Sequence, residues 1–267
     1  MADSGAIPER LLPLAGGCNF RDLGGYVTTD GARLRWRQVF RSGVMTHLQA
    51  ADVAALEALG IACVVDLRRA DERRSEPTRW PGTSVQLLSH DDPEDAGTLG
   101  RLIEGRTLDA DAARTAMIEL YRLMPQWLVP RLKLIFQTLA ASPAPLLFNC
   151  AAGKDRTGFA AAVLLECLGV PRDTVLADYL LTNEVARLDA FLMQHQGGQL
   201  GVGNSAHPIL ALPAEVRLPL LAADADYLDA ALTGVTEAYG SSQAFVRDGL
   251  GLGEGGLAAL RRHLLES

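Results

Sequence analysis

Pro145-Leu146-Leu147-Phe148-Asn149-Cys150-Ala151-Ala152-Gly153-Lys154-Asp155-Arg156-Thr157-Gly158 is the stretch of the chain that says most about its fold. It opens with a short apolar run, its middle is small and flexible, and residues 159–168 after it are rich in Ala and Leu. This pattern predicts a buried strand, a loop and a buried helix. Because open α/β sheets bind ligands where such strands end, the stretch indicates a binding site in the loop.

Cys150 and Arg156 are six positions apart, a spacing that is weak by itself because Cys63 and Arg69 share it. No glycine separates Cys63 from Arg69, and Cys63 lies in a β-branched run, so we interpret it as a core residue. Around Cys150 the small residues allow successive backbone N–H groups to form an anion-binding concavity. The helix that follows adds the positive end of its dipole.

The chemistry expected of this loop is attack on phosphorus. The planar guanidinium of Arg156 matches two oxygens of a phosphate. The same positive field favours the thiolate form of Cys150 near neutral pH, and we expect the Thr157 hydroxyl to donate to the sulfur. Such a thiolate is arranged to form a cysteinyl-phosphate that water then hydrolyses. The competing interpretation is a structural cysteine beside an incidental arginine, and the order of strand, loop and helix favours the catalytic one.

The rest of the chain is expected to alternate short strands with helices. A hairpin is predicted at 24–43 with its turn at Asp30-Gly31, and Thr46 is the expected N-cap of the next helix. Strands separated by helices indicate an α/β fold with a mainly parallel central sheet flanked by helices, and we expect one domain over residues 1–267. The further predicted elements are buried strands at 61–65 and 85–88, helices at 107–141 (with a break near Pro125 and Pro130), 171–195 and most of 214–266, and a Gly- and Pro-rich loop at 197–213.

Composition excludes several classes of function. Apolar residues make up 48% and charged residues 21% of the 267 residues, as in ordinary globular proteins. The net charge of −7 argues against a nucleic-acid binder, and no apolar run is long enough for a membrane helix. Four scattered cysteines and five histidines without ligand spacing predict no metal and no cofactor. The start shows no signal peptide, so we expect a cytoplasmic protein, with signal-less secretion left open.

Three further segments accompany the loop, and together they resemble one family. They are Asn19-Phe20-Arg21-Asp22-Leu23-Gly24-Gly25-Tyr26, Val65-Asp66-Leu67-Arg68 and Asp178-Tyr179-Leu180-Leu181-Thr182-Asn183. With the loop, they resemble the cysteine-dependent protein-tyrosine and phosphoinositide phosphatases, in the bacterial branch found in mycobacteria and Listeria. The resemblance covers roughly residues 16 to 266. It implies a tyrosine-phosphatase-like fold with a helical, lid-like C-terminal portion.

The resemblance also implies roles for the loop residues. The family's nucleophile falls on Cys150 and its phosphate-binding arginine on Arg156. The Lys154-Asp155 pair is associated in the family with phosphoinositides as well as phosphotyrosine, phosphoserine and phosphothreonine, which fits an ammonium at the loop rim. The expected partners are therefore phosphorylated proteins or phosphoinositides, and the residues expected to bind the phosphate are Ala151, Ala152, Gly153, Lys154 and Thr157.

Three aspartates are candidates for the general acid that protonates the leaving oxygen. Asp92 aligns with the family's acidic loop, although Asp91 stands where the family has proline. Asp155 lies in the loop from Cys150 to Gly158, which we call the signature loop. There it either donates the proton itself or orients an arginine. Asp66 follows a strand and is expected to pair with nearby arginines. Asp92 and Asp155 carry similar weight, with Asp66 behind them.

Two departures from the family motivate an alternative function. Asn149 stands where the family has histidine, and asparagine cannot carry charge, so we expect a slower enzyme with a less favoured thiolate. With the altered acidic loop, this suggests a catalytically weak phosphate-recognition module as the alternative. A sulfur-transfer or arsenate-reducing enzyme is a further rival, which needs a second thiol, and Cys167 is poorly placed for it. For Arg21, Asp22 and Arg41 two interpretations stay open: they border the site, as the matching segment does in the family, or they lie on the solvated surface, as isolated charges more often do.

Overall fold

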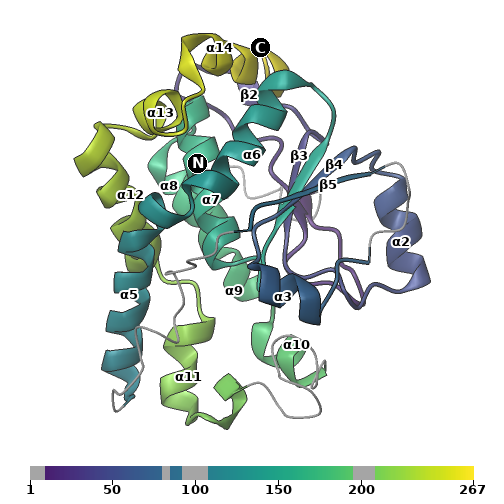
Figure 1. Cartoon of the computed structure of the whole chain (residues 1–267), viewed down its shortest axis with the longest axis vertical. Helices are drawn as coiled ribbons and strands as arrows, with labels where there is room; N and C mark the ends of the chain where they lie inside the picture. Colours follow the sequence, from purple (N-terminus) through teal and green to yellow (C-terminus); the bar gives the residue numbers. More distant parts are fainter. Residues whose placement is uncertain (1–9, 80–84, 92–107, 195–207) are drawn as a thin grey trace.

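The computed structural model describes residues 10–79, 85–91, 108–194 and 208–267. At its centre lies a five-stranded sheet in the order β1-β3-β6-β4-β5 (Figure 1). Strand β1 is antiparallel to β3, and the other neighbours are parallel. The predicted α/β class with a mostly parallel sheet is therefore confirmed. The strands are β1 Arg21–Asp22, β3 Val39–Ser42, β4 Cys63–Asp66, β5 Gln86–Ser89 and β6 Leu146–Asn149.

Both faces of the central strands are buried, which explains their continuous apolar runs. In β6, Leu146 and Phe148 pack into the larger core, whereas Leu147 joins a smaller core on the opposite face. In β4, Val65 and Val64 divide in the same way. This alternation follows from the two-residue period of a strand.

Helices cover the two faces unequally. Figure 1 shows α2 on one side of the sheet and the larger group, including α5, α6, α7 and α12, on the other. The predicted break near Pro125 and Pro130 is confirmed, because α5 ends and α6 begins around Leu128. Pro125 lies in the last turn of α5, and Pro130 lies in the first turn of α6. The bounds are α2 Ala50–Glu57, α5 Ala110–Trp127, α6 Val129–Ala141, α7 Asp155–Leu168, α8 Arg172–Leu180, α12 Ala225–Tyr239 and α14 Gly253–Leu264.

The first sixty residues differ from the prediction in two ways. The turn near Asp30-Gly31 forms, with Thr28 N donating to Ala32 O. Its second arm is only the short strand β2 (Arg33–Leu34), which pairs with β7 (Leu265–Glu266), while β3 belongs to the parallel sheet. The predicted N-cap Thr46 is wrong, because α2 begins after Gln49 and the Thr46 hydroxyl instead donates to the carbonyls of Glu76 and Pro77.

Two further predictions are corrected. Strand β5 was expected to be buried, but it is the edge strand of the sheet and Leu87 is 56% exposed. The helix expected at 171–195 is broken into three, because α8 is followed by α9 (Thr182–Val185) and α10 (Leu188–Gln194). Most of the predicted loop at 197–213 lies outside the described residues.

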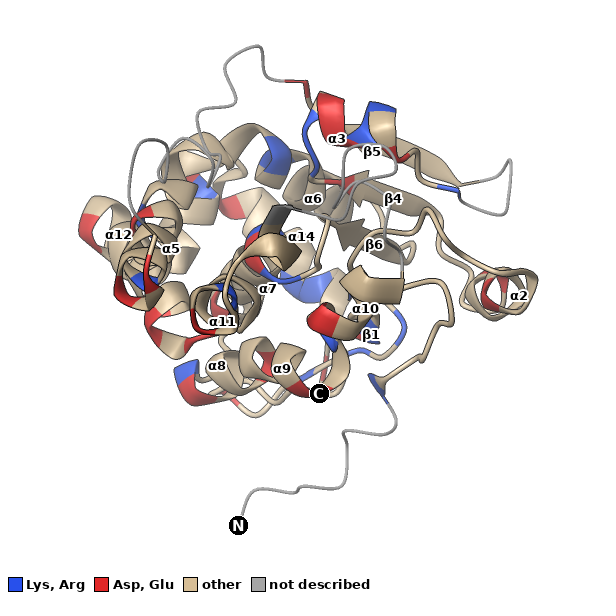
Figure 2. Cartoon of the chain, turned by 90° about the horizontal axis from the view of Figure 1, so that it is seen from below, with Lys and Arg blue, Asp and Glu red and all other residues tan. Residues whose placement is uncertain are grey.

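The C-terminal portion is helical, as expected. Its remaining elements are the 3₁₀ turn Pro208–Ala211, α11 (Ala214–Leu221), α13 (Ser242–Ala244) and a π-helical turn at Phe245–Gly249. Figure 2, which views the molecule from below, shows α10 in front of the sheet near β6 and β1, α11 on the side of α5, and α3 (Ala70–Ser75) beside β5. In α11, Leu220 is buried whereas Leu218 is 65% exposed, so the helix is only partly core. Among the described residues, no helix is long and apolar enough to cross a membrane.

Gly158 in α7 provides a test of this packing. A methyl group there would lie 2.8 Å from the ring of buried Tyr179. We expect Gly158→Ala to lower the free energy of unfolding by about 1–2 kcal/mol, because overpacking outweighs the gain in helix propensity. Gly255→Ala in the first turn of α14, where nothing lies within 4 Å, is the matched control and should gain up to about 1 kcal/mol. Urea denaturation measures both, and equal stability of Gly158→Ala and wild type would contradict the packing described here.

Candidate active site

The signature loop begins where three parallel strands end side by side. Asn149, the last residue of β6, lies opposite Ser42 of β3 and Asp66 of β4. Cys150 follows at once and is 1% exposed. The loop therefore lies at the carboxyl ends of the parallel strands, which is where open α/β sheets bind ligands.

The loop presents a row of backbone N–H groups that have no partner. Within the described part of the chain, the N–H groups of Ala151, Ala152, Gly153 and Lys154 donate no hydrogen bond. Gly153 has a φ of 67°, and a Cβ atom there would lie 2.5 Å from Gly43 N, so only glycine fits. Unpaired, consecutive N–H groups beside a helix N-terminus form an anion site.

The carbonyls of the same peptides are tied to the surrounding protein. Ala151 O accepts from Val44 N at 2.8 Å, and Ala152 O accepts from Asn19 Nδ2 at 3.3 Å. Gly153 O accepts from both Asn19 Nδ2 and Arg41 Nη2, each at 2.8 Å. Because a trans peptide directs its C=O and N–H in opposite directions, the contact with Val44 turns the Ala152 N–H away from Val44. The contacts with Asn19 and Arg41 likewise turn the next two N–H groups away from those side chains.

Arg156 is held by a carboxylate that the sequence did not single out. Its Nη1 and Nη2 lie 2.6 and 2.8 Å from the two oxygens of Glu72, which also accepts from Arg69 N at the start of α3. Burial alone would raise the pKa of Glu72, but Arg156 and its hydrogen bonds lower it to about 2. The sequence did not reveal the pairing, because Glu72 and Arg156 are 84 positions apart.

Asp155, the first residue of α7, makes a hydrogen bond and an ion pair through one oxygen. Its Oδ1 lies 2.8 Å from Tyr121 Oη and 2.7 Å from Lys154 Nζ, and Tyr121 Oη lies 2.7 Å from Tyr179 Oη. Within the described residues, Asp155 Oδ2 has no partner, and the side chain is 24% exposed. One oxygen is therefore fixed while the other is available.

Lys154 does not extend toward the loop rim, as the sequence led us to expect. Its side chain is 1% exposed, and its ammonium contacts Asp155 and donates to Ala222 O at 3.2 Å. Nζ also lies 5.9 Å from the centre of the Tyr227 ring. The next residue, Ala223, exchanges two backbone hydrogen bonds with the Asn183 side chain. The ammonium thus connects the loop to the linker between α11 and α12.

Two side chains next to the nucleophile keep unpaired polar atoms. Thr157 Oγ1 and Asn149 Oδ1 are fully buried and have no hydrogen-bond partner within the described residues. The expected hydrogen bond from Thr157 to the sulfur is therefore absent. Asn149 Nδ2 makes one long contact, 3.5 Å from Cys150 O.

The other two candidate acids differ from Asp155. Asp66 is paired with Arg68, whose Nη2 lies 2.7 Å from Asp66 Oδ2, and Thr78 Oγ1 donates to the same oxygen. This matches the expectation that Asp66 pairs with an arginine. Asp92 lies outside the described residues, so its role stays a prediction.

A buried ionic cluster lies behind the loop and corrects the expectation of solvated charges. Arg21 and Arg41 are 0% exposed, and both bind Asp178, at 3.0 Å (Nε to Oδ1) and 2.6 Å (Nη1 to Oδ2). Tyr26 Oη donates to Asp178 Oδ1 at 3.0 Å. Arg21 and Tyr26 come from the first family-like segment and Asp178 from the third, whereas Arg41 lies outside these segments. The pattern did not reveal the burial of either arginine.

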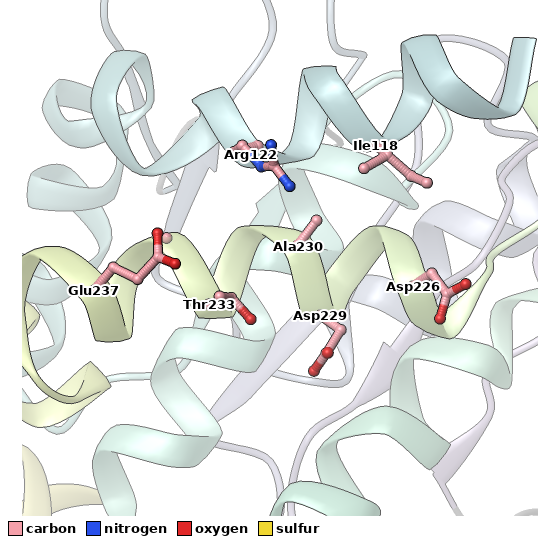
Figure 3. A pocket seen from close by; sticks show the side chains of 8 residues that line it. Ile118, Arg122, Asp226, Asp229, Ala230, Thr233 and Glu237 are labelled. Carbon is pink, nitrogen blue, oxygen red and sulfur yellow. The ribbon is translucent and has the colours of Figure 1, made fainter. Parts of the chain in front are cut away.

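A groove elsewhere in the described part of the chain is poorly suited to a phosphate ester. A groove of about 510 Å³ between α5 and α12 (Figure 3) is lined by three carboxylates, from Asp226, Asp229 and Glu237, and by Arg122. A negative lining disfavours a phosphate ester. Among the described residues, no group of three or more His, Cys, Asp and Glu side chains is placed to hold a metal ion.

A cysteine at the end of a parallel strand, a loop of unpaired N–H groups and a fixed arginine define the class of cysteine-dependent phosphatases. Comparison with known families agrees with this class. The model of the tyrosine phosphatase family matches residues 12–266, and the chain belongs to this family.

Curated relatives cover nearly the whole chain. A Cupriavidus necator protein, provisionally named a tyrosine-protein phosphatase, is 35% identical over 92% of this chain and 85% of its own length. The triple specificity protein phosphatase PtpB of Mycobacterium tuberculosis is 34% identical over 88% of this chain and 92% of its own length. The crystal structure of P. aeruginosa TpbA overlaps with a TM-score of 0.33 and 20% identity over 59% of this chain and 77% of its own.

The pair of Glu72 and Arg156 is open to direct measurement. Without the carboxylate the guanidinium loses its fixed orientation, so we expect Glu72→Gln to lower kcat/KM for p-nitrophenyl phosphate about 10- to 100-fold. Asp71→Asn, which removes a neighbouring carboxylate paired with Arg69 on the surface, should stay within about twofold of wild type.

The same pair predicts a pH dependence of stability. The folded pKa of Glu72, about 2, lies below its ordinary value of 4.5, so its ionised form stabilises the fold above pH 4.5. This contribution is lost as the pH falls toward 2. The difference in unfolding free energy between wild type and Glu72→Gln should therefore shrink between pH 6 and pH 3, and a difference that grows in this range would contradict the pairing.

Proposed function

We propose that the protein hydrolyses phosphoric monoesters of phosphorylated proteins, phosphotyrosine foremost, through a cysteinyl-phosphate intermediate. The observation that carries the proposal is the row of four unpaired N–H groups between Cys150 and the fixed guanidinium of Arg156. A phosphate dianion supplies the acceptors that these donors lack. Thr157 Oγ1 is one more unpaired donor beside them.

The proposed reaction has two steps. The thiolate of Cys150 attacks phosphorus, the bond from phosphorus to the ester oxygen breaks, and an acid protonates the leaving oxygen. Water then attacks the phosphorus of the cysteinyl-phosphate, which returns the thiolate and releases phosphate. The loop N–H groups and Arg156 stabilise the equatorial oxygens in both transition states.

Asp155 is our first candidate for the proton donor. Its Oδ1 is held by Tyr121 and Lys154, while Oδ2 has no partner among the described residues and can carry the proton. Asp92 remains the alternative implied by the family resemblance. We assign Asp66 to structure rather than to proton transfer, because Arg68 and Thr78 occupy its carboxylate.

We further propose a single domain that acts in the cytoplasm. The C-terminal strand β7 pairs with β2 near the start of the chain, so both ends contribute to one fold. All four cysteines are buried and unpaired, which suits a reducing compartment.

Substitution of the nucleophile tests the proposed reaction. We expect Cys150→Ser to lower the hydrolysis of p-nitrophenyl phosphate by about 10⁴-fold or more, whereas Cys63→Ser, with the same spacing to an arginine, should leave it unchanged. Acid quenching during turnover of a ³²P-labelled phosphotyrosine peptide should leave label on wild type and none on Cys150→Ser. Wild-type protein that binds the peptide without turnover would instead support the phosphate-recognition module.

The substrate range includes phosphoserine, phosphothreonine and phosphoinositides by resemblance, and Lys154 allows a test of how they are bound. Because its ammonium is buried against Asp155 and Ala222, we expect Lys154→Met to lower kcat/KM for a phosphotyrosine peptide and for a phosphoinositide by similar factors, about tenfold. Lys133→Met, at the only other lysine of the chain, is the control. Selective loss of phosphoinositide hydrolysis would show that the ammonium contacts the headgroup.

A further inference from the structure

Arg21, Arg41 and Asp178 carry an unbalanced charge in the interior. Burial alone would raise the pKa of Asp178, but the two arginines lower it overall, so the carboxylate is ionised. Burial and the like charge of Arg21 lower the pKa of Arg41 only to about 10, so Arg41 is also charged at neutral pH. Two cations therefore share one anion, and the cluster has a net charge of about +1.

The acidic and basic side chains of the loop, and Asp66 of β4, each lie against a partner of the opposite type. Arg156 faces Glu72, Lys154 faces Asp155, and Arg68 faces Asp66. Among the described residues nearby, Tyr26, Tyr121, Tyr179 and Cys18 are neutral, because burial raises the pKa of each, that of Cys18 to about 12. Asp22, next to Arg21 on β1, faces Arg10 and Arg37. The charge of the buried cluster is thus left to be balanced by an anion in the loop.

Hydrogen bonds connect the cluster to the loop on its outer side. Arg21 Nη1 donates to Asn19 Oδ1, which orients Asn19 Nδ2 toward Ala152 O and Gly153 O. Arg41 Nη2 donates to the same Gly153 carbonyl, while Arg41 Nε is buried without a partner. The two guanidiniums therefore hold the carbonyls of Ala152 and Gly153, one directly and one through Asn19. The N–H groups of the same two peptides point to the opposite side of the loop.

We propose that Arg21 and Arg41, whose one carboxylate partner among the described residues is Asp178, form a buried cationic unit that turns the loop N–H groups toward the phosphate and favours a negatively charged sulfur at Cys150. Asn149, which precedes Cys150 at the end of β6, is neutral and supplies no positive charge beside the sulfur. The cationic unit supplies that charge instead. Arg21, Arg41 and Asp178 are positioning residues that never touch the substrate. The inference rests on the proposed function of the loop.

The pH profile of Cys150 alkylation tests this unit independently of turnover. Iodoacetate reacts with the thiolate, and burial raises the pKa of the other three thiols to about 11 or 12, so they contribute little below pH 9. We expect Arg41→Gln to raise the midpoint of alkylation by about one pH unit and Asp178→Asn to lower it by a similar amount. Cys150→Ser gives the background.

Two further variants separate charge from shape. Arg41→Lys keeps the charge, so its midpoint should stay near that of wild type, while the lost hydrogen bond should weaken binding of inorganic phosphate about tenfold. Arg131→Gln removes a fully buried arginine on α6 and should leave the midpoint unchanged. Circular dichroism shows which variants fold, and Arg41→Lys with Asp178→Asn suffices if Arg41→Gln does not.

Opposite shifts in Arg41→Gln and Asp178→Asn support the cationic unit. Midpoints that stay within 0.2 pH units of wild type (about the precision of such a titration), or that move in the same direction, overturn it. Failure of the proposed function is a separate result, because a protein without phosphatase turnover still has a Cys150 alkylation midpoint. Conversely, phosphatase turnover by the wild type together with unshifted midpoints in the variants overturns the inference about the cationic unit. The assignment of the protein as a phosphatase is then unaffected.

Discussion

The site depends on the carbonyl of Gly153 and its two donors, Asn19 Nδ2 and Arg41 Nη2. A peptide group is a rigid plane, so whatever fixes its oxygen also fixes its N–H. A free loop of small residues has many conformations, and most of them present carbonyls to an approaching anion. The surrounding protein removes those conformations before any ligand arrives. This preorganisation lowers the cost of binding a dianion and of stabilising the charge that develops in a transition state.

Features set by local sequence were predictable, and those set by distant contacts were not. The order of strand, loop and helix around Cys150 follows from neighbouring residues, as does the helix break near Pro125 and Pro130. The burial of Arg21 and Arg41 depends on Asp178, which lies 157 and 137 positions away. Composition alone assigns such arginines to the surface, because an unpaired buried charge is too costly.

The same reason explains the errors at single residues. Lys154 was expected at the rim because the motif carries no information on Ala222, 68 positions further on. Thr46 suits an N-cap, but its hydroxyl finds carbonyls in another loop. Strand β5 has the apolar run of a buried strand, yet nothing in that run reveals that it lies at the edge of the sheet. The fold class and the position of the loop after β6 were therefore within reach of sequence, and the contacts that orient the loop were not.

The pairing of β2 with β7 ties the order of synthesis to the order of folding. Residues 33–34 are made early, but their strand partner is residues 265–266, and Arg35 also bonds to Leu264 and Leu265. On the ribosome, this small sheet stays open until residues 265–266 have emerged. The nascent protein therefore passes through a stage in which the central strands have paired while β2 still lacks its partner strand β7. The segment of Asn19 and Arg21 directly precedes β2 in the chain. We therefore expect the loop to reach its final conformation only after residues 265–266 have been synthesised.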